Sequence, residues 1–286
     1  MVHLNKIMSR ILYIAHFYKG STSYDRLSDL KKDFHVDCLN INLYFPLWRK
    51  SISSIWRRLS FGPPFFYLYS ALIKTLENNQ YEFILIERNI YFSYKKLLFI
   101  KNKFDIKLIM FCHDSIKIKA NISKIFIDSL CLFDTVITTK DYDISLYKKY
   151  RAKKIHLVKD SISSDILLNS LNINYSNVIY KYDLGFIGRW ELGRENLIKK
   201  LSQDLDMKIV ISGPGWLEKK YSFPKNVTII DSIWGQDYIK LIQNIKINLG
   251  FLSEKAQDSF TTRLVEVPIY NGFMLTNYNN KTNNIF

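Results

Sequence analysis

Short apolar runs alternate along the chain with longer amphipathic segments. In the first half, such runs predict buried strands at residues 11–16, 83–87, 107–112 and 135–138. Segments such as 94–103 lie between them and have the spacing of helices. A regular alternation of strand and helix predicts a parallel sheet.

A second series of apolar runs follows at residues 183–188, 208–212, 227–230 and 245–250, with a helix-like stretch at 197–205. The sequence therefore predicts an α/β protein with two units. A chain of 286 residues that is 48% hydrophobic is large enough to bury two modest cores.

The connection between the two units is predicted at residues 161–180, which are rich in Ser and Asn and carry little apolar periodicity. We predict domains at residues 1–170 and 171–286. Residues 277–284 are polar enough to form a loose tail.

The charge balance favours an anionic partner: 41 Lys and Arg against 26 Asp and Glu give a net charge of +15. The basic residues are scattered along the whole chain, whereas a nucleic-acid-binding protein needs a continuous basic groove. We therefore expect phosphorylated substrates or an acidic membrane face as partners, and no nucleic acid.

Cysteine usage and hydropathy point to the cytoplasm. The three cysteines are odd in number and widely spaced in apolar runs, so we expect buried thiols and no disulfide framework or zinc site. The first ten residues lack the apolar stretch of a signal peptide, and no run approaches the roughly 18 apolar residues that span a bilayer.

Candidate chemistry gathers where predicted strands end, because helix N-termini and loop amides converge there in parallel sheets. At the end of strand 183–188, Gly188 permits a close approach of the backbone to a phosphate that Arg189 can neutralise. The alternative is a tight turn with a solvated arginine.

The next strand is followed by a glycine-rich turn made of Gly213, Pro214 and Gly215, and then by Trp216. The glycines free the backbone, and the indole ring is available to stack on a flat base. The alternative is a plain turn with a core tryptophan.

A third junction carries Asp258, Thr261, Thr262, Arg263 and Glu266 at a loop-to-helix boundary. The hydroxyls, loop amides and arginine can hold a diphosphate, and Glu266, one helical turn along, can accept both hydroxyls of a ribose. The alternative is a helix capped by Thr261 or Thr262 with an internal Arg–Glu pair.

These motifs, in this order, resemble the CgeB-like (spore maturation protein type) glycosyltransferases. The resemblance is carried by residues 183–190, 213–216, 247–252, 261–266 and 272–276, and in the first half by 11–23, 113–114 and 133–140. The family belongs to the GT-B superfamily. The resemblance implies two Rossmann-like domains facing across a catalytic cleft, with the acceptor bound by the first and a nucleotide-sugar donor by the second.

Carried over residue by residue, Arg189 and Arg263 would hold the donor phosphates, Trp216 and its glycine-rich loop would border the base, and Glu266 would bind the ribose. Asp258 would face the donor sugar. The pair of acids resembles the pattern of retaining enzymes, with Asp in the first place. The resemblance implies no metal and no cofactor, since the nucleotide sugar is a substrate and cations stabilise the leaving diphosphate.

In the first domain, the resemblance would place His113 and Asp114 at the cleft, where either orients the donor sugar or acts as a general base. The alternative for His113 is a strand-end histidine satisfied by a backbone carbonyl. The loop of Gly20, Ser21 and Thr22 precedes a helix and can offer amides to an acceptor or phosphate, or simply cap the helix.

Cations and aromatics interleave at residues 48–50, 56–58 and 61–69, as in a membrane-surface helix or a lipid-phosphate site. The alternative is an amphipathic helix packed on the sheet, since 65–76 has core spacing. The chain ends at Phe286, shortly after strand 272–276, where relatives continue. We expect a shortened second domain, exposed apolar surface and reduced activity.

We interpret the chain as a metal-independent glycosyltransferase of the hexosyltransferase type. It would move a sugar from a nucleotide-diphosphate donor to a glycan, lipid-linked or peptide acceptor in surface polysaccharide assembly, in contact with the inner membrane face. The alternatives are a non-catalytic glycosyltransferase-like binding subunit or truncated pseudoenzyme, a sugar-nucleotide epimerase, and a basic nucleic-acid-binding protein.

Overall fold

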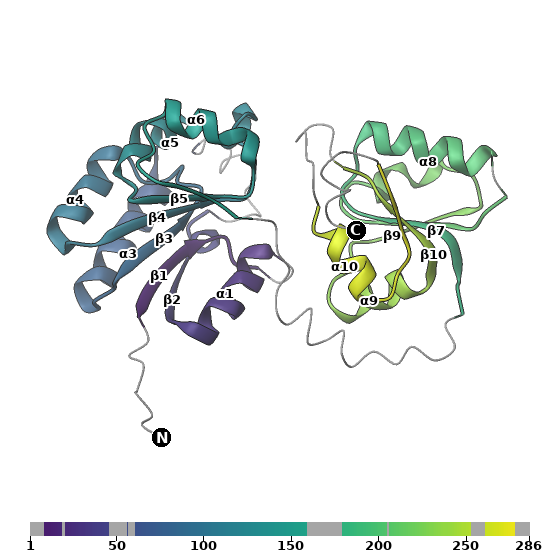
Figure 1. Cartoon of the computed structure of the whole chain (residues 1–286), viewed down its shortest axis with the longest axis horizontal. Helices are drawn as coiled ribbons and strands as arrows, with labels where there is room; N and C mark the ends of the chain where they lie inside the picture. Colours follow the sequence, from purple (N-terminus) through teal and green to yellow (C-terminus); the bar gives the residue numbers. More distant parts are fainter. Residues whose placement is uncertain are drawn as a thin grey trace, which may run out of the picture. The chain divides into compact units, whose positions relative to one another are not determined.

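The computed structural model describes residues 9–18, 21–45, 56, 61–158, 179–204, 206–252 and 261–277. The chain divides into two compact units, Met1–Lys159 and Asp160–Phe286, and each is described by itself (Figure 1). The domain boundary predicted between residues 170 and 171 falls within 159–178, outside the described residues.

The first unit contains a parallel six-stranded sheet in the order β2-β1-β3-β4-β5-β6. Its strands are β1 (Arg10–Ala15), β2 (His35–Asn40), β3 (Phe83–Glu87), β4 (Lys107–Cys112), β5 (Thr135–Thr138) and β6 (Ile155–Leu157). Its helices are α1 (Thr22–Asp33), α3 (Pro63–Asn78), α4 (Tyr94–Phe104), α5 (Lys124–Ser129) and α6 (Ile144–Lys149). Short 3-10 turns are η1 (Ile41–Leu43), η3 (Lys119–Asn121), η4 (Leu130–Leu132) and η5 (Asp141–Asp143).

Alternate side chains of β1 pack in two different hydrophobic cores, one on each face of the sheet. Ile11 and Tyr13 pack with Leu27 of α1 in one core, while Leu12 and Ile14 pack with α3 and α4 in the other. Because both faces are covered, β1 and β3 are almost wholly apolar, as expected for a parallel sheet (Figure 1).

The second unit contains a parallel five-stranded sheet in the order β11-β10-β7-β8-β9. Its elements are β7 (Tyr182–Ile187), α8 (Leu192–Asp204), β8 (Ile209–Ser212), η6 (Leu217–Ser222), β9 (Val227–Ile230), α9 (Gln236–Gln243), β10 (Ile245–Gly250), α10 (Arg263–Ile269) and β11 (Met274–Thr276). Helix α8 packs on one face through Ile198, and α9 and α10 pack on the other through Ile242 and Val267.

Each sheet has one point at which the strand order reverses. In the first unit the chain leaves β1 for β2 and returns on the other side at β3. In the second it runs outward from β7 through β8 to β9 and returns at β10. Ligands of open α/β sheets bind outside the carboxyl ends of the strands at such points. We therefore expect ligand sites at the carboxyl ends of β1 and β3 in the first unit, and of β7 and β10 in the second.

The predicted α/β class with two parallel-sheet units is confirmed. The prediction of three buried thiols is wrong for Cys38, which is exposed because it lies on the edge strand β2; Cys112 is buried and Cys131 half-buried. No helix in the described part of the chain is long and apolar enough to cross a membrane.

Candidate functional site

Two loops are joined at the carboxyl edge of the second sheet, after β7 and β8. The Gly188 N–H donates to the carbonyl of Ser212 at 2.8 Å, and the Trp190 N–H donates to that of Pro214 at 2.9 Å. The loops approach so closely that a Cβ on Gly213 would lie 2.1 Å from the Gly188 oxygen, and Gly213 has φ of +138°. Only glycine fits there without strain.

Trp216 belongs to the core of this unit. Its ring is fully buried, at 5.9 Å from the ring of Phe186, and its Nε1–H donates to the Gly188 oxygen at 2.8 Å. The prediction that Trp216 stacks on a base is therefore wrong, because no face of the ring reaches solvent. The Gly188 N–H is likewise already donated, so this amide is not available to a phosphate, whereas Pro214 and Gly215 are exposed in the loop.

Trp190 is the partly exposed aromatic side chain of the same loop pair, next to the exposed Arg189. Its Nε1–H donates to Glu195 at 2.6 Å, and the Lys219 ammonium lies 5.0 Å from its ring centroid. The Trp190 ring is thus hydrogen-bonded to the Glu195 carboxylate and makes a cation–π contact with Lys219 at the carboxyl edge of the sheet. We did not predict a role for Trp190, although its position directly after a strand-ending Gly-Arg pair was the available signal.

Arg194, near the start of α8, joins the two loops that flank the switch point. Its guanidinium donates to the carbonyl of Arg189 at 2.9 Å and to that of Phe251 at 3.3 Å. It also lies 5.4 Å from the ring of Phe186. The sequence did not indicate this role, since α8 begins at Leu192 and not at the predicted residue 197.

Helix α10 places Arg263 and Glu266 on its first turn, beside Tyr238 of α9. The Tyr238 hydroxyl donates to Glu266 Oε2 at 2.6 Å, while Oε1 has no hydrogen-bond partner among the described residues. Burial, followed by the negative charge of Glu266, raises the pKa of Tyr238 well above its usual range, although the Arg263 cation opposes the shift. Tyr238 therefore remains a donor that orients the carboxylate.

The Arg263 guanidinium is incompletely hydrogen-bonded. Its Nε is buried and has no hydrogen-bond partner among the described residues. An unsatisfied donor on a buried part of a cation is costly, and an anion beside the group offsets that cost.

Thr261 and Thr262 precede α10 and are half-buried, and Thr262 makes no side-chain capping hydrogen bond. The predicted side-chain cap by Thr262 is therefore absent, because its backbone is already helical. Asp258 falls within residues 253–260, outside the described residues. Its role stays a prediction.

In the first unit, His16 follows β1 and Arg88 follows β3, on the two sides of the switch point. The His16 ring has Nδ1 2.6 Å from Asn42 Oδ1 and Nε2 2.6 Å from the Tyr91 hydroxyl. Since an amide oxygen only accepts, Nδ1 carries a proton and donates to Asn42, while Nε2 is paired with the Tyr91 hydroxyl. We did not predict this oriented imidazole; a histidine at a strand end was its only signal.

A half-buried carboxylate lies at the end of β3, the strand that pairs with β1. Glu87, the last residue of β3, accepts from Ser23 at 2.6 Å and from the side chains of Tyr13 and Arg26. Burial, and then the Glu87 charge, raises the pKa of Tyr13 above its usual range. This cluster fastens the start of α1 to the sheet.

His113 and Asp114 follow β4. His113 is half-buried, and its carbonyl accepts from Thr139 Oγ1 at 3.2 Å. The Asp114 carboxylate is 59% exposed and lies 3.0 Å from Arg88, a residue with φ of +41°. Asp114 therefore presents a solvent-facing carboxylate at the same edge as His16.

Ser21 caps α1, since its Oγ accepts from the Tyr24 N–H at 3.2 Å and it is buried. The capping alternative is thus confirmed for Ser21, while Thr22 is exposed and Gly20 lies outside the described residues. Roles of Ser21 and Thr22 towards an acceptor stay predictions.

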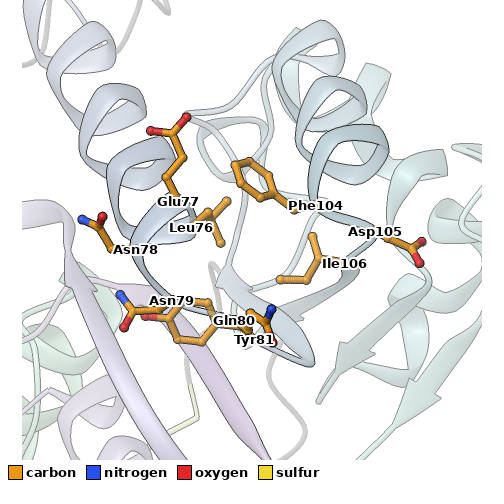
Figure 2. Close-up of a pocket in the computed structure, with 9 residues that line it drawn as sticks. All are labelled: Leu76, Glu77, Asn78, Asn79, Gln80, Tyr81, Phe104, Asp105 and Ile106. Carbon is orange, nitrogen blue, oxygen red and sulfur yellow. The ribbon is translucent and has the colours of Figure 1, made fainter.

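A recess of ≈ 740 Å³ lies away from these residues (Figure 2). It is bounded by the ends of α3 and α4 and the loops before β3 and β4, and its lining includes Glu77, Tyr81 and Phe104. Because these loops enter their strands, the recess lies at the amino edge of the sheet, opposite the candidate site. Among the described residues, no group of three or more His, Cys, Asp or Glu side chains is placed to hold a metal ion.

Most of the second unit matches a protein-family model. Residues 194–286 match the family model described as Glycosyl transferase-like, a region that includes Arg263 and Glu266. No curated protein matches the chain significantly.

Solved structures match almost the whole chain. An alpha-glucosyltransferase in complex with UDP-glucose and DNA containing an abasic site has a TM-score of 0.62 and 12% identity, covering 94% of this chain and 80% of its own. A glycosyltransferase involved in avilamycin A biosynthesis has a TM-score of 0.52 and 10% identity, covering 94% and 78%.

UDP-GlcNAc 2-epimerase from Neisseria meningitidis, bound to UDP-GlcNAc, has a TM-score of 0.56 and 12% identity, covering 93% and 82%. The chain has the GT-B fold. These identities establish the fold alone, and the finer resemblance to CgeB-like enzymes stays a prediction.

Proposed function

We propose that the protein is a glycosyltransferase that uses a nucleotide-diphosphate sugar, bound by the second unit. The arrangement of Glu266, oriented by Tyr238 and close to the incompletely satisfied Arg263, carries the proposal. It lies inside the region that matches the glycosyl transferase-like family model. Two of the similar GT-B structures contain UDP-glucose or UDP-GlcNAc, which supports this class of donor.

In the proposed donor complex, Arg263 and the exposed Arg189 neutralise the diphosphate, and the free oxygen of Glu266 accepts from the ribose hydroxyls. Tyr238 keeps the carboxylate in place while that contact forms. Negative charge develops on the diphosphate as the bond to the sugar breaks, and the two guanidinium groups stabilise it. Asp258 is proposed to face the donor sugar.

The first unit is proposed to bind the acceptor. His113, Asp114 and His16 lie at its carboxyl edge, and one of them takes the proton of the acceptor hydroxyl. The acceptor is a glycan, lipid-linked or peptide molecule of surface polysaccharide assembly, reached from the cytoplasm. The proposed reaction involves no metal.

A sugar-nucleotide epimerase is the second candidate. UDP-N-acetylglucosamine 2-epimerases from Rickettsia bellii and Neisseria meningitidis match the chain with TM-scores of 0.51 and 0.56. An epimerase changes its nucleotide sugar without an acceptor. A transferase releases the nucleoside diphosphate and forms a new glycosidic bond.

The test is calorimetry and thermal shift of the purified chain with uridine, guanosine, adenosine and thymidine diphosphates and their sugars. We expect saturable binding of one nucleotide, with a rise in melting temperature by mass action. Arg263→Ala and Glu266→Gln should each weaken this binding at least about tenfold, since each removes a charged hydrogen bond. Lys246→Ala, an exposed position on β10, is the matched control and should bind as the unaltered chain does.

The donor proposal fails if no nucleotide binds the folded protein, or if both site variants bind as tightly as Lys246→Ala. The products of the bound nucleotide sugar, separated by mass and chromatography, decide between the two candidates. A new epimer in the absence of any acceptor would overturn the transferase proposal.

A further inference from the structure

The first turns of α3 present aromatic side chains to solvent. Phe61 just before the helix and Phe66 and Tyr67 on it are 79%, 64% and 61% exposed. The opposite face of the same helix is buried through Phe65 and Leu68. The exposed rings are therefore a second apolar face, beyond the one that builds the core.

Helix α4 lies beside α3 and supplies cations. The Lys96 ammonium is 4.6 Å from the Tyr69 ring centroid, and the Lys103 ammonium is 2.6 Å from Glu77. The two helices carry five lysines (Lys74, Lys95, Lys96, Lys101 and Lys103), and Glu77 is the single acidic residue within their bounds. Lys74 and Lys95 have no ion-pair partner among the described residues.

The exposed rings lie near the candidate acceptor edge. Helices that connect parallel strands begin at the carboxyl edge of the sheet, so Phe66 and Lys95, near the starts of α3 and α4, are at that edge. The ring of Phe65 is 6.1 Å from that of Tyr91, whose hydroxyl is 2.6 Å from His16 Nε2. Phe65 and Tyr91 thus connect the helix that carries the exposed aromatics to His16 at the polar edge.

We propose that this docking surface, made of Phe61, Phe66, Tyr67, Tyr94, Lys95 and Lys96, binds an anionic lipid bilayer and brings a lipid-linked acceptor to the carboxyl edge of the first sheet. Aromatic rings enter the headgroup boundary while neighbouring lysines bind anionic headgroups. A second copy of the chain fits this surface less well, because a symmetric contact would set these lysines against each other. The acceptor part rests on the proposed transferase function; the bilayer contact does not.

The test is co-sedimentation of the full chain with vesicles of phosphatidylcholine, with and without phosphatidylglycerol. We expect binding to the anionic vesicles that weakens with added salt. Phe66→Ser with Tyr67→Ser should lower the affinity about tenfold or more, since both rings leave the interface. Lys95→Gln with Lys96→Gln should lower it roughly 25-fold, since each lysine near the surface contributes about fivefold.

The matched control is Tyr221→Ser, which removes a 98% exposed ring from the second unit and should leave vesicle binding unchanged. The proposal is overturned if the unaltered chain does not bind anionic vesicles, or if the Phe66/Tyr67 variant binds them as tightly as the control. It is also overturned if light scattering shows that the unaltered chain is a dimer and that the variant's only effect is to make it a monomer. Nucleotide binding is measured on the same samples, so that a failure of the bilayer proposal can be distinguished from a failure of the proposed donor site.

Discussion

At the scale of single residues, Glu266 is informative because its two oxygens have different surroundings. Oε2 accepts from Tyr238, and Oε1 has no partner among the described residues. A carboxylate held at one oxygen and open at the other is already oriented, so binding a diol costs little side-chain entropy. The sequence predicted Glu266 but not Tyr238, which lies 28 residues away along the chain.

Tyr238→Phe should weaken nucleotide affinity about fivefold, because the carboxylate loses the donor that orients it. The raised pKa of Tyr238 means that its hydroxyl keeps its proton, so this contribution should persist from neutral to mildly alkaline pH. Calorimetry with the bound nucleotide measures the change. Tyr182→Phe, a half-buried tyrosine on β7, serves as control. Equal affinity of the two variants would show that Tyr238 does not position Glu266.

At the scale of elements, the joined loops after β7 and β8 require glycine at position 213 for steric reasons. A Cβ at Gly213 would meet the Gly188 oxygen, whereas one at Gly235 (φ +60°) would meet nothing within 4 Å. Gly213→Ala should therefore destabilise the protein by about 2 kcal/mol or more, through backbone strain and a clash. Gly235→Ala should cost about 1 kcal/mol from strain alone. Urea unfolding compares them; a larger loss for Gly235→Ala would refute the packing role.

Another contact between elements is sensitive to pH. Asp134, just before β5, accepts from the Lys101 ammonium of α4 at 2.5 Å and from the Leu108 N–H of β4 at 2.9 Å. Burial opposes ionisation, but the hydrogen bonds from Lys101 and the Leu108 N–H, together with the lysine charge, outweigh it and lower the pKa of Asp134. A lowered pKa in the folded state gives stability that is complete above the unfolded-state pKa and lost as pH falls through the folded-state value.

Asp134→Asn should thus reduce the free energy of unfolding by about 1 kcal/mol at neutral pH, a modest figure because a third of the carboxylate side chain is exposed. The difference from the unaltered protein should shrink at acidic pH, as the pH falls below the ordinary aspartate pKa of about 3.9 and through the lowered folded-state value. Denaturant unfolding at neutral and acidic pH measures this. Asp128→Asn, at an exposed position of α5, is the control. If the difference in the free energy of unfolding did not change with pH, the stabilisation by Asp134 would not arise from its charge.

The sequence predicted the central strands far better than the edges. Four central strands, β3, β4, β5 and β10, have the predicted bounds, because strands buried in a parallel sheet are largely apolar runs, and so does the edge strand β9. The edge strands β2 and β6 were missed, since β2 mixes His35 and Asp37 with apolar residues and β6 is mostly exposed. Trp216 was misassigned for a related reason: periodicity does not reveal which loop residue turns inward, and its indole fills the core beneath Gly188.

At the scale of the whole molecule, the two units have separate sheets and separate hydrophobic cores. The donor residues belong to one unit and the proposed acceptor edge and docking surface to the other. A ligand that binds one unit should stabilise that unit first, because stability is not uniform across a chain with independent cores. The proposed division of labour therefore has a measurable signature in the full-length protein.

Hydrogen–deuterium exchange with a saturating nucleoside diphosphate should show protection at α10 and in the loop between β7 and α8. The carboxyl ends of β1 and β3 should exchange as in the free protein. At a concentration 100 times the dissociation constant, the stabilisation reaches about 2.7 kcal/mol, so amides that open with the second unit slow by about a hundredfold. The Arg263→Ala protein under the same conditions is the control, and its pattern should match that without ligand. Protection confined to the first unit would place the nucleotide there and reverse the assignment of donor and acceptor sides.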